Sequence, residues 1–513
     1  MAITASSKPS ESEPEVRTAA GVLRGGREAG LAVFRGIPFA EPPVGALRFA
    51  APQPVRSWDG VRPAVAYGPP PPQSGLLGGP QDSAGDDWLT INVWTPEPDP
   101  AAGFPVMVWI PGGGYVAGNS SLPEYDAGHL ARSGVVVATL NYRHGIEGFA
   151  QIDGAPANRG LLDQVAALQW VRDNIRMFGG DPARVTLFGQ SAGGGSVAAL
   201  LAMPRAMPRA AGLFHRAVAQ SVPGTFFSPE LATDIAAACA AELGVRPTVS
   251  GLSAVAPALL PAAGDAISHK AAQWREPWGQ ITHRPTPFAP VVDGDVLPAT
   301  PWQALADGAA RDIALLVGHT RDEHRLFSLI DGVLGQITHE QTETALHMLA
   351  PGPNGTHRYR EAFPAATDEE LYELVNADWL FRMPSLHLAD AQLAGGGQAH
   401  LYELTWSAPA MDGALGACHG LDVPLVFGNL SSGQTAMLIG DPPYPAAEEL
   451  SAQIRRSWTA FATTGDPGWP PYDTAHRLTQ LFDTPSMVTA YPEEPSRLLW
   501  QNHTFPALPL LTR

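Results

Sequence analysis

Strand-like and helix-like segments alternate along the middle of the chain, and this alternation restricts the fold more than any other feature. Residues 104–110 (FPVMVWI) and 134–142 (GVVVATLNY) are short apolar runs, which is typical of strands covered on both faces. Residues 160–180 then end in paired glycines and have apolar side chains at the spacing of a helix: Leu161, Val165, Leu168 and Val171. This alternation predicts an α/β fold with a large, mainly parallel sheet and helices on both faces.

A serine separates the next predicted strand from the next predicted helix. The strand signal ARVTLF precedes Gly189, the Ala- and Leu-rich run SVAALLAM follows, and Ser191 lies at the centre of a G-x-S-x-G motif between them. This order predicts a nucleophile elbow, in which a sharp turn lifts the hydroxyl above the sheet and the helix N-terminus offers N–H groups to an oxyanion. The alternative is an ordinary Gly/Ser-rich turn, because the short motif alone is weak.

Composition narrows the class of function. The chain has 513 residues, of which 45% are hydrophobic and 16% charged, as in ordinary globular proteins. Its net charge of −18 argues against nucleic acid as a partner, since nucleic-acid affinity comes from clustered basic side chains. No apolar run approaches the ~18 to 20 residues of a membrane span, and the polar start lacks the apolar core of a secretory signal. The sequence therefore predicts a cytoplasmic protein, with secretion left open.

The domain organisation is less clear from composition. A length of about 150 residues per domain would suggest about three domains, but no linker or internal repeat is visible after about Val16. Residues 1–15 are predicted to be a disordered tail, and the proline-rich stretch 67–80 to be a surface loop. The two cysteines, Cys239 and Cys418, exclude a disulfide scaffold.

Several stretches distributed along the chain after the tail carry a family resemblance: FRGIPFAEPPVGALRF, LTINVWTP, VMVWIPGGGY, NYRHGIEGF, FAPVVDGDVLP, GHTRDE, GACHGLDVPLVFG and TGDPGWPPYD. Together they resemble the type B carboxylesterases, the cholinesterase/carboxylesterase family, and bacterial members most. The resemblance implies an α/β-hydrolase fold with loop and helix insertions around a gorge, in one domain covering residues 16–513. It also implies a serine carboxylesterase that cleaves carboxylic esters through an acyl-enzyme.

The resemblance supplies catalytic partners for the serine, whose hydroxyl is a poor nucleophile without a base. The motif GACHGLDVP places His419 in the position of the base. The motif GHTRDE places Glu323 in the position of the acid, directly after Asp322. The order Ser…Glu…His is the order of α/β-hydrolases. Spacing alone would not select His419 among the 15 histidines.

The glycine run PGGGY, after the predicted strand 104–110, matches the family's oxyanion hole. The resemblance assigns its N–H groups to Gly113 and Gly114, and Ala192 supplies a third. Taken alone, three glycines would indicate an ordinary turn. Many relatives have histidine where this chain has Pro111, which has no N–H, so the support of the loop stays open.

Ser221, in AVAQSVPG, matches a buried family serine that hydrogen-bonds near the triad acid, although a plain buried serine explains it equally well. Trp88 replaces a cysteine of many eukaryotic relatives, so that disulfide cannot form, which fits a reducing compartment. Cys418 adjoins the predicted base and is interpreted as a bystander. Packing is the default role for four residues in a region that lines the gorge in relatives: Trp274, Trp278, His283 and Phe288. No role is assigned to His144 or His319.

No cofactor or metal is predicted, because the chain lacks H-E-x-x-H, P-loop and dinucleotide-binding spacings and its two cysteines lie far apart. The expected partner is a small-molecule ester, while carbamates, amides, lipids and polyester fragments are alternatives with the same mechanism. A second class is a cholinesterase-like binding protein without activity. That class is marked by a missing triad residue, whereas all three are present here. The oligomeric state, monomer or dimer, is left open.

Overall fold

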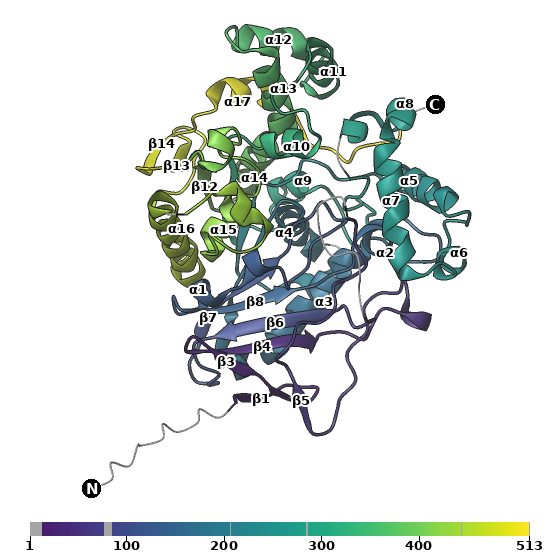
Figure 1. Cartoon of the computed structure of the whole chain (residues 1–513), viewed down its shortest axis with the longest axis vertical. Helices are drawn as coiled ribbons and strands as arrows, with labels where there is room; N and C mark the ends of the chain where they lie inside the picture. Colours follow the sequence, from purple (N-terminus) through teal and green to yellow (C-terminus); the bar gives the residue numbers. More distant parts are fainter. Residues whose placement is uncertain (1–12, 76–84, 206, 284–285, 443, 512–513) are drawn as a thin grey trace.

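A large sheet runs through the middle of the molecule (Figure 1). The computed structural model describes residues 13–75, 85–205, 207–283, 286–442 and 444–511. Within these residues the sheet has eleven strands, in the order β14-β13-β12-β11-β10-β9-β7-β8-β6-β4-β3, and a second sheet has the order β1-β2-β5. The large sheet contains β3 (Gly26–Glu28), β4 (Leu31–Pro38), β6 (Thr90–Thr95), β7 (Phe104–Ile110), β8 (Val136–Leu140), β9 (Gly180–Gln190), β10 (Arg216–Gln220), β11 (Ala314–Thr320), β12 (Ala399–Leu404), β13 (Leu478–Phe482) and β14 (Met487–Ala490). The small sheet contains β1 (Glu15–Arg17), β2 (Val22–Arg24) and β5 (Val61–Pro63).

The central strands of the large sheet are parallel. Parallel pairing runs without interruption from β8 through β7, β9, β10, β11 and β12 to β13. The outer strands β3, β4, β6 and β14 pair antiparallel with their neighbours. The prediction of a mainly parallel sheet is therefore confirmed.

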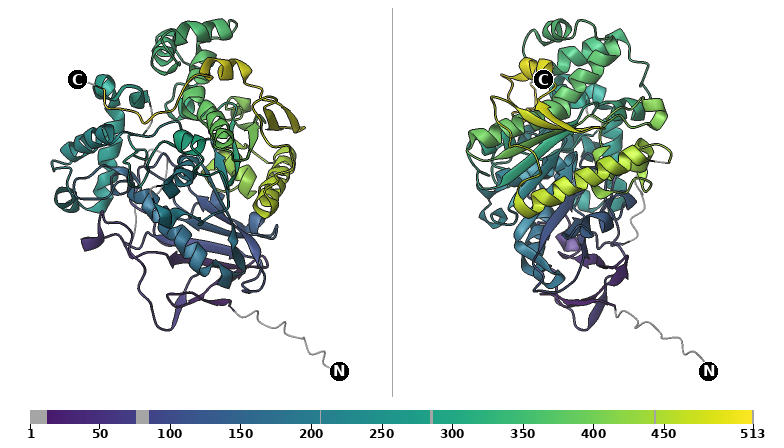
Figure 2. Two further views of the ribbon diagram at one scale, coloured as in Figure 1. Left: turned by 180° about the vertical axis from the view of Figure 1, so that it is seen from behind. Right: turned by 90° about the vertical axis from the view of Figure 1, so that its left-hand side faces the viewer.

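Helices cover both faces of this sheet (Figure 2). Alternate side chains of β7 show the two faces: Val106 and Val108 belong to an apolar core with α3, α4 and α14, whereas Met107 and Trp109 belong to a second core with α1, α15 and α16. The α-helices are α1 (Gly128–Ala131), α2 (Gly145–Phe149), α3 (Arg159–Asn174), α4 (Ala192–Ala202), α5 (Pro229–Glu242), α6 (Val249–Ser253), α7 (Leu260–His269), α8 (Arg275–Trp278), α9 (Pro301–Ala306), α10 (Arg325–Ile330), α11 (His339–Leu349), α12 (Gly355–Ala362), α13 (Asp368–Ala377), α14 (Met383–Ala394), α15 (Asp422–Phe427), α16 (Pro445–Thr464) and α17 (Glu494–Trp500).

The elements predicted around the serine are present. The predicted strand 104–110 is β7, and the predicted strand 134–142 contains β8. The predicted helix 160–180 is α3 followed by a 3₁₀ turn, η3 (Ile175–Phe178), and its last glycine already belongs to β9. These short stretches fold as their own patterns indicate, because both faces of the central sheet are covered.

Two predicted segments lie partly outside the described residues. Of the predicted tail 1–15, residues 1–12 are outside, and Glu15 already pairs with Arg24 in the small sheet. Of the predicted surface loop 67–80, residues 76–80 are outside, and residues 71–74 are buried, so the surface prediction is wrong there. The reason is a polar contact inside the protein: the side-chain carbonyl of Gln73 accepts the N–H of Gly118 at 2.9 Å.

Candidate active site

Ser191 lies on a sharp turn between β9 and α4. Its backbone has φ +59° and ψ −125°, a strained conformation for a residue with a side chain. Its N–H donates to the carbonyl of Gln220 on the neighbouring strand β10 at 2.9 Å. The glycines on either side are needed for close packing, since a Cβ on Gly193 would lie 2.1 Å from the carbonyl oxygen of Ile110 and one on Gly189 would lie 2.6 Å from Gly193. These features match the nucleophile elbow predicted from the sequence.

His419 and Glu323, which lie far apart in the chain, meet beside this turn. Glu323 follows β11, and His419 lies in the loop before α15. The ring Nδ1 of His419 donates to Oε2 of Glu323 at 2.5 Å. The neighbouring Asp322 has other partners: it accepts the N–H of Ala417 at 2.8 Å and pairs with Arg321 at 3.0 Å. The structure therefore places Glu323, and not Asp322, against the imidazole.

The carboxylate of Glu323 is fully buried and accepts several hydrogen bonds. Besides His419, its donors are Ser221 Oγ at 2.6 Å and the N–H of Thr320 at 2.9 Å, both to Oε1. Burial raises the pKa of this carboxyl, but the attraction of His419 and these hydrogen bonds outweigh burial and hold the pKa below its usual range. Glu323 therefore stays ionised at neutral pH and keeps the Nδ1 proton of the ring in place.

Ser221→Ala should lower kcat about 10-fold and leave KM little changed. Ser221 directly follows β10, is fully buried and contacts the acid, and a hydrogen bond to a charged group contributes about 1.5 to 3 kcal/mol. Steady-state kinetics on an activated ester measure the effect, with the exposed Ser133→Ala as the matched control. An unchanged kcat in a variant with the wild-type melting temperature would show that Ser221 is a plain buried serine.

The glycine run after β7 lies beside Ser191. Gly113, Gly114 and Ala192 line the same cavity as Ser191 and His419. In the described part of the chain, the N–H groups of these three residues have no hydrogen-bond acceptor, which leaves them available to a ligand oxygen. Gly113 has φ +114°, and a Cβ there would lie 2.2 Å from the carbonyl oxygen of Ala117. This is the arrangement expected of an oxyanion hole.

The same loop is supported without the histidine that many relatives have at position 111. The hydroxyl of Tyr142 donates to the carbonyl of Pro111 at 2.8 Å, and Nε2 of His144 donates to the carbonyl of Gly118 at 2.8 Å. Burial lowers the pKa of His144 to about 4, so its ring is neutral and Nε2 carries a proton for this bond. His144 therefore has a supporting role that the sequence did not indicate.

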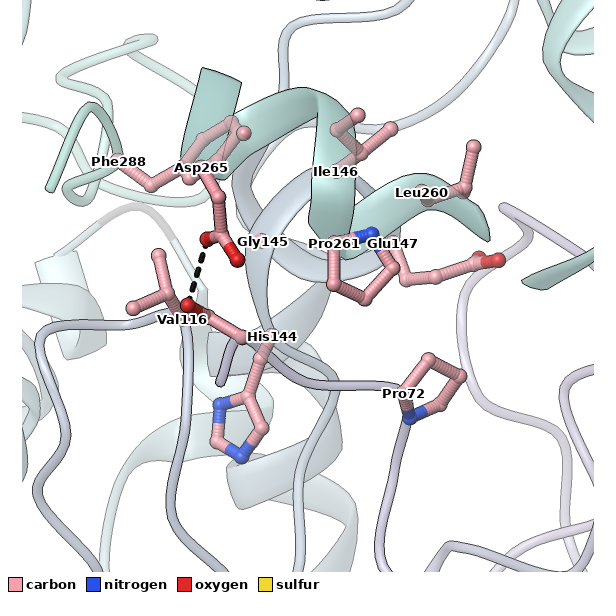
Figure 3. Close-up of a pocket in the computed structure, with 12 residues that line it drawn as sticks. Pro72, Val116, His144, Gly145, Ile146, Glu147, Leu260, Pro261, Asp265 and Phe288 are labelled. Atoms are coloured by element: carbon pink, nitrogen blue, oxygen red, sulfur yellow. Dashed lines mark hydrogen bonds between the residues drawn. The ribbon is translucent and has the colours of Figure 1, made fainter. Parts of the chain in front are cut away.

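Figure 3 shows a small cavity that adjoins this loop at Val116 and His144. Its volume is about 10 Å³, enough for about one water molecule, and the hydroxyl of Ser74 donates to Asp265 across it at 2.5 Å. Phe288 lines this small cavity, while Trp274 and Trp278 stack on each other with ring centres 4.6 Å apart. None of these three aromatic residues lines the larger cavity beside Ser191.

The larger cavity has the size and polarity of a small-molecule site. Its volume is about 500 Å³, within the range of ligand pockets, which is roughly 300 to 1,000 Å³. Its wall is largely apolar, with Leu122, Leu326, Phe327, Leu329, Ile330, Leu380, Phe381, Val423 and Leu438. The cavity is thus suited to an apolar substrate held beside the serine.

Two phenylalanines of this wall hold the imidazole of His419. Phe381 stacks on the ring with centres 4.2 Å apart, and Phe327 lies at 5.2 Å. Phe381 belongs to the π-helical turn η9 (Asp378–Arg382), and such turns are frequent at functional sites. Sequence reasoning missed both rings: a single π-helical turn has no sequence pattern of its own, and nothing in the short helix α10 marks Phe327 as a contact of His419.

The side chain of Gln190 contacts Nε2 of His419, the ring nitrogen that would accept the proton of a catalytic serine. Its side-chain Nε2 lies 3.2 Å from Nε2 of His419. Because Nδ1 donates to Glu323, Nε2 has a free lone pair and accepts this amide N–H. Among the described residues, no hydrogen bond joins Ser191 Oγ to the ring, and such bonds are often open in unliganded enzymes. Gln190 was also missed by sequence reasoning.

Cys418, next to the base, is buried and free, and burial raises the pKa of its thiol to about 12, so it stays protonated. Among the described residues, no three His, Cys, Asp or Glu side chains come together as metal ligands would. None of the described helices has an apolar stretch that could reach across a lipid bilayer.

Glu373, near the loop of Glu323, has an unusual pKa. This residue lies on α13 and accepts a hydrogen bond from Ser328 Oγ at 2.5 Å. Burial raises the pKa of its carboxyl to about 7. A glutamate in the unfolded chain has a pKa of about 4.3. Because the pKa is higher in the folded state, protonation of Glu373 stabilises the fold. This contribution to the free energy of unfolding is fully present below about pH 4 and is lost as the pH rises to about 7.

Glu373→Gln removes this titration and keeps the shape of the side chain. The wild type loses this stabilisation between about pH 5 and pH 8, whereas the variant does not. The stability of the variant minus that of the wild type should therefore increase by about 2 kcal/mol over this range, and the difference in melting temperature should increase with it. Scanning calorimetry at several pH values measures the difference, and the exposed Glu340→Gln is the control. A difference that is constant over this range would contradict the assignment.

The geometry agrees with comparisons to known proteins. A sequence model of the carboxylesterase family matches residues 12–496. The chain is 37% identical to para-nitrobenzyl esterase of Bacillus subtilis (strain 168), over 94% of this chain and 97% of the relative. It is 35% identical to phenmedipham hydrolase of Pseudarthrobacter oxydans, over 90% of this chain and 93% of the relative.

A solved structure extends the agreement to three dimensions. The carboxylesterase EST55 of Geobacillus stearothermophilus superimposes with a TM-score of 0.83 at 34% identity, covering 95% of this chain and 100% of that one. Together with the large, mainly parallel sheet, this likeness confirms the α/β-hydrolase fold. The chain therefore belongs to the carboxylesterase family and is a carboxylic ester hydrolase.

Proposed function

We propose that the protein hydrolyses small, largely apolar carboxylic esters through an acyl-enzyme on Ser191, with His419 as base and Glu323 as acid. One observation carries the proposal: Ser191 on its strained turn and His419, which is paired with Glu323 at 2.5 Å, line the same cavity of about 500 Å³. A nucleophile, an oriented base and free N–H donors are the parts that acyl transfer needs.

The first half of the reaction forms the acyl-enzyme. The Ser191 hydroxyl replaces the Gln190 amide at Nε2 of His419, and Oγ attacks the ester carbonyl carbon as its proton moves to Nε2. The carbonyl oxygen becomes an oxyanion, which accepts the N–H groups of Gly113, Gly114 and Ala192. The bond to the alcohol oxygen then breaks, and His419 returns the proton to the departing alcohol.

The second half releases the acid. A water molecule gives a proton to Nε2 of His419 and attacks the acyl carbon, and the bond to Ser191 Oγ breaks when the proton returns to Oγ. Throughout, Glu323 stays ionised and stabilises the imidazolium, since its pKa is held below the usual range. Ser221 and the N–H of Thr320 keep this carboxylate in position.

The relatives support the substrate class. By its name, the relative from Bacillus subtilis acts on para-nitrobenzyl esters, which are small aromatic esters. The apolar wall around Phe327 and Phe381 fits such compounds. The alternative of a binding protein without activity has no support in the site, because the serine, histidine and glutamate are all present and two of them are already paired.

A chain-length panel of p-nitrophenyl esters tests the proposal. We expect release of p-nitrophenol from several members of the panel and complete inhibition by one equivalent of a serine-directed organophosphate. Absence of turnover across the panel, or turnover that resists the organophosphate, would contradict it.

A further inference from the structure

A buried cluster of charged side chains lies at the π-helical turn η9. Arg382, the last residue of this turn, has a side chain that is only 2% exposed and forms ion pairs with two carboxylates. These are Asp378, the first residue of the same turn, at 3.1 Å, and Glu493, just before α17, at 2.6 Å. Burial raises the pKa of Glu493, but the attraction of Arg382 outweighs burial and holds the pKa below its usual range. The pair is therefore charged at neutral pH.

Stability alone is a poor reason for such a cluster. Moving charges out of water costs free energy, and a buried ion pair is often no more stabilising than apolar side chains of the same volume. The π-helical turn that carries Arg382 is itself a rare conformation, found mostly at functional sites. A rare turn held by buried charges indicates that the geometry of η9 has a use in the reaction.

The turn contacts the catalytic base through Phe381, the residue directly before Arg382. The phenyl ring stacks on the imidazole of His419 with centres 4.2 Å apart and planes at 26°. A displacement of η9 would therefore let the imidazole shift or tilt, which moves Nε2 relative to Ser191. Misplacing a reacting group by about 1 Å can lower the rate on the order of 10²-fold.

The same turn is attached to the segments that carry the catalytic acid and its hydrogen-bond donor. Nη1 of Arg382 donates to the carbonyl of Arg321 at 3.4 Å, two residues before Glu323. The carbonyl of Leu380 accepts the N–H of Gly224, in the segment after β10, at 2.8 Å. Arg382 thus lies where η9 meets the loop of the acid, and its two carboxylates fix its side chain there.

We propose that Arg382 is a positioning residue for the catalytic base: its ion pairs with Asp378 and Glu493 fix η9 so that Phe381 holds the imidazole of His419 in place for proton transfer. This proposal rests on the role of His419 proposed above. Arg382 is absent from the lining of the cavity beside Ser191, so its loss should change kcat more than KM. The expected loss in kcat is about 10- to 100-fold.

The test variant is Arg382→Met combined with Asp378→Asn. Removing the arginine alone would leave Asp378 buried without a counter-charge, which is strongly destabilising. The asparagine avoids this charge and still accepts the hydroxyl of Tyr359, which donates to Asp378 at 2.8 Å. Reactive Ser191 is counted by titration with an organophosphate, and kcat is calculated per reactive serine on a p-nitrophenyl ester. Unfolded molecules then do not contribute, so a purely structural role would leave this kcat unchanged.

The matched control makes the same two changes at an exposed cluster. Arg360, whose side chain is 38% exposed, also pairs with two carboxylates, those of Glu343 and Asp368. Arg360→Met combined with Asp368→Asn should keep the wild-type kcat per reactive serine. Glu493→Gln, at the partly exposed edge of the buried cluster, is measured in parallel because it keeps an acceptor for Arg382 and should fold. Its kcat per reactive serine should fall about 3- to 10-fold.

A double-mutant cycle tests whether Arg382 acts through the stacked ring. Phe381→Leu should itself lower kcat, and adding Arg382→Met and Asp378→Asn to it should cost at most about 2-fold more. An undiminished second loss in the Phe381→Leu enzyme would overturn the proposal. So would wild-type kcat per reactive serine in both the Arg382→Met/Asp378→Asn and Glu493→Gln enzymes. Near-normal turnover by His419→Ala would instead refute the proposed function.

Discussion

Ser191→Ala should lower kcat by about 10⁴- to 10⁶-fold, because the variant has no oxygen to form the acyl-enzyme. Alanine retains the Cβ at φ +59°, so the turn between β9 and α4 keeps its packing and its strain. The fold and the cavity should therefore persist, and the melting temperature should stay near that of the wild type.

Steady-state kinetics on a p-nitrophenyl ester measure the loss, with Ser133→Ala as a control for a serine at the surface. A residual rate far above the uncatalysed reaction is expected, because the N–H groups of Gly113, Gly114 and Ala192 remain. Near-normal turnover in the purified Ser191→Ala enzyme would remove Ser191 from the role of nucleophile.

Glu323→Gln should lower kcat by about 10²-fold or more, whereas Asp322→Asn should affect stability more than kcat. The amide of the glutamine variant keeps the shape but no longer favours the Nδ1 proton and the positive form of His419. Asp322 instead joins the loop before His419 to β11, through Ala417 and Arg321. Its loss should cost on the order of 1 kcal/mol of stability.

The two variants are compared in kcat and melting temperature under the same conditions. The account predicts a stable Glu323→Gln enzyme with strongly reduced kcat and an active, less stable Asp322→Asn enzyme. The reverse pattern, with Asp322→Asn inactive and Glu323→Gln active, would place the acid one residue earlier.

The fold around the serine was predictable because its signals are local. The apolar strand β7, the elbow at Ser191 and the helix α3 each follow from a short window of sequence. The pairing of His419 with Glu323 joins residues 96 positions apart, and only resemblance to a family could suggest it. The same resemblance selects Glu323 over Asp322 as the acid, and in the structure Glu323 is the residue that contacts the ring of His419.

Other features of the site depend on contacts that no local pattern contains. The proline-rich stretch around Gln73 resembled a surface loop, yet Gln73 is buried against Gly118 because the glycine loop needs an acceptor there. The supporting contact of His144 has no signal in the sequence, because the carbonyl it binds belongs to Gly118, 26 residues earlier in the chain. Glu124 looks like an ordinary charged loop residue in the sequence, yet it is buried and its carboxylate packs closely against Gly433, far along the chain. The cytoplasmic location stays a prediction from the sequence.

The most direct test of the central claim is the mass of the protein during turnover. The wild type is mixed with excess p-nitrophenyl ester, quenched in acid within the first turnovers, and analysed as the intact chain and as peptides. The account predicts an added mass of one acyl group per chain, located on Ser191, together with a matching burst of p-nitrophenol. Rapid turnover with an acyl group on another residue would contradict an acyl-enzyme at Ser191, as would a burst of p-nitrophenol without any acylated protein.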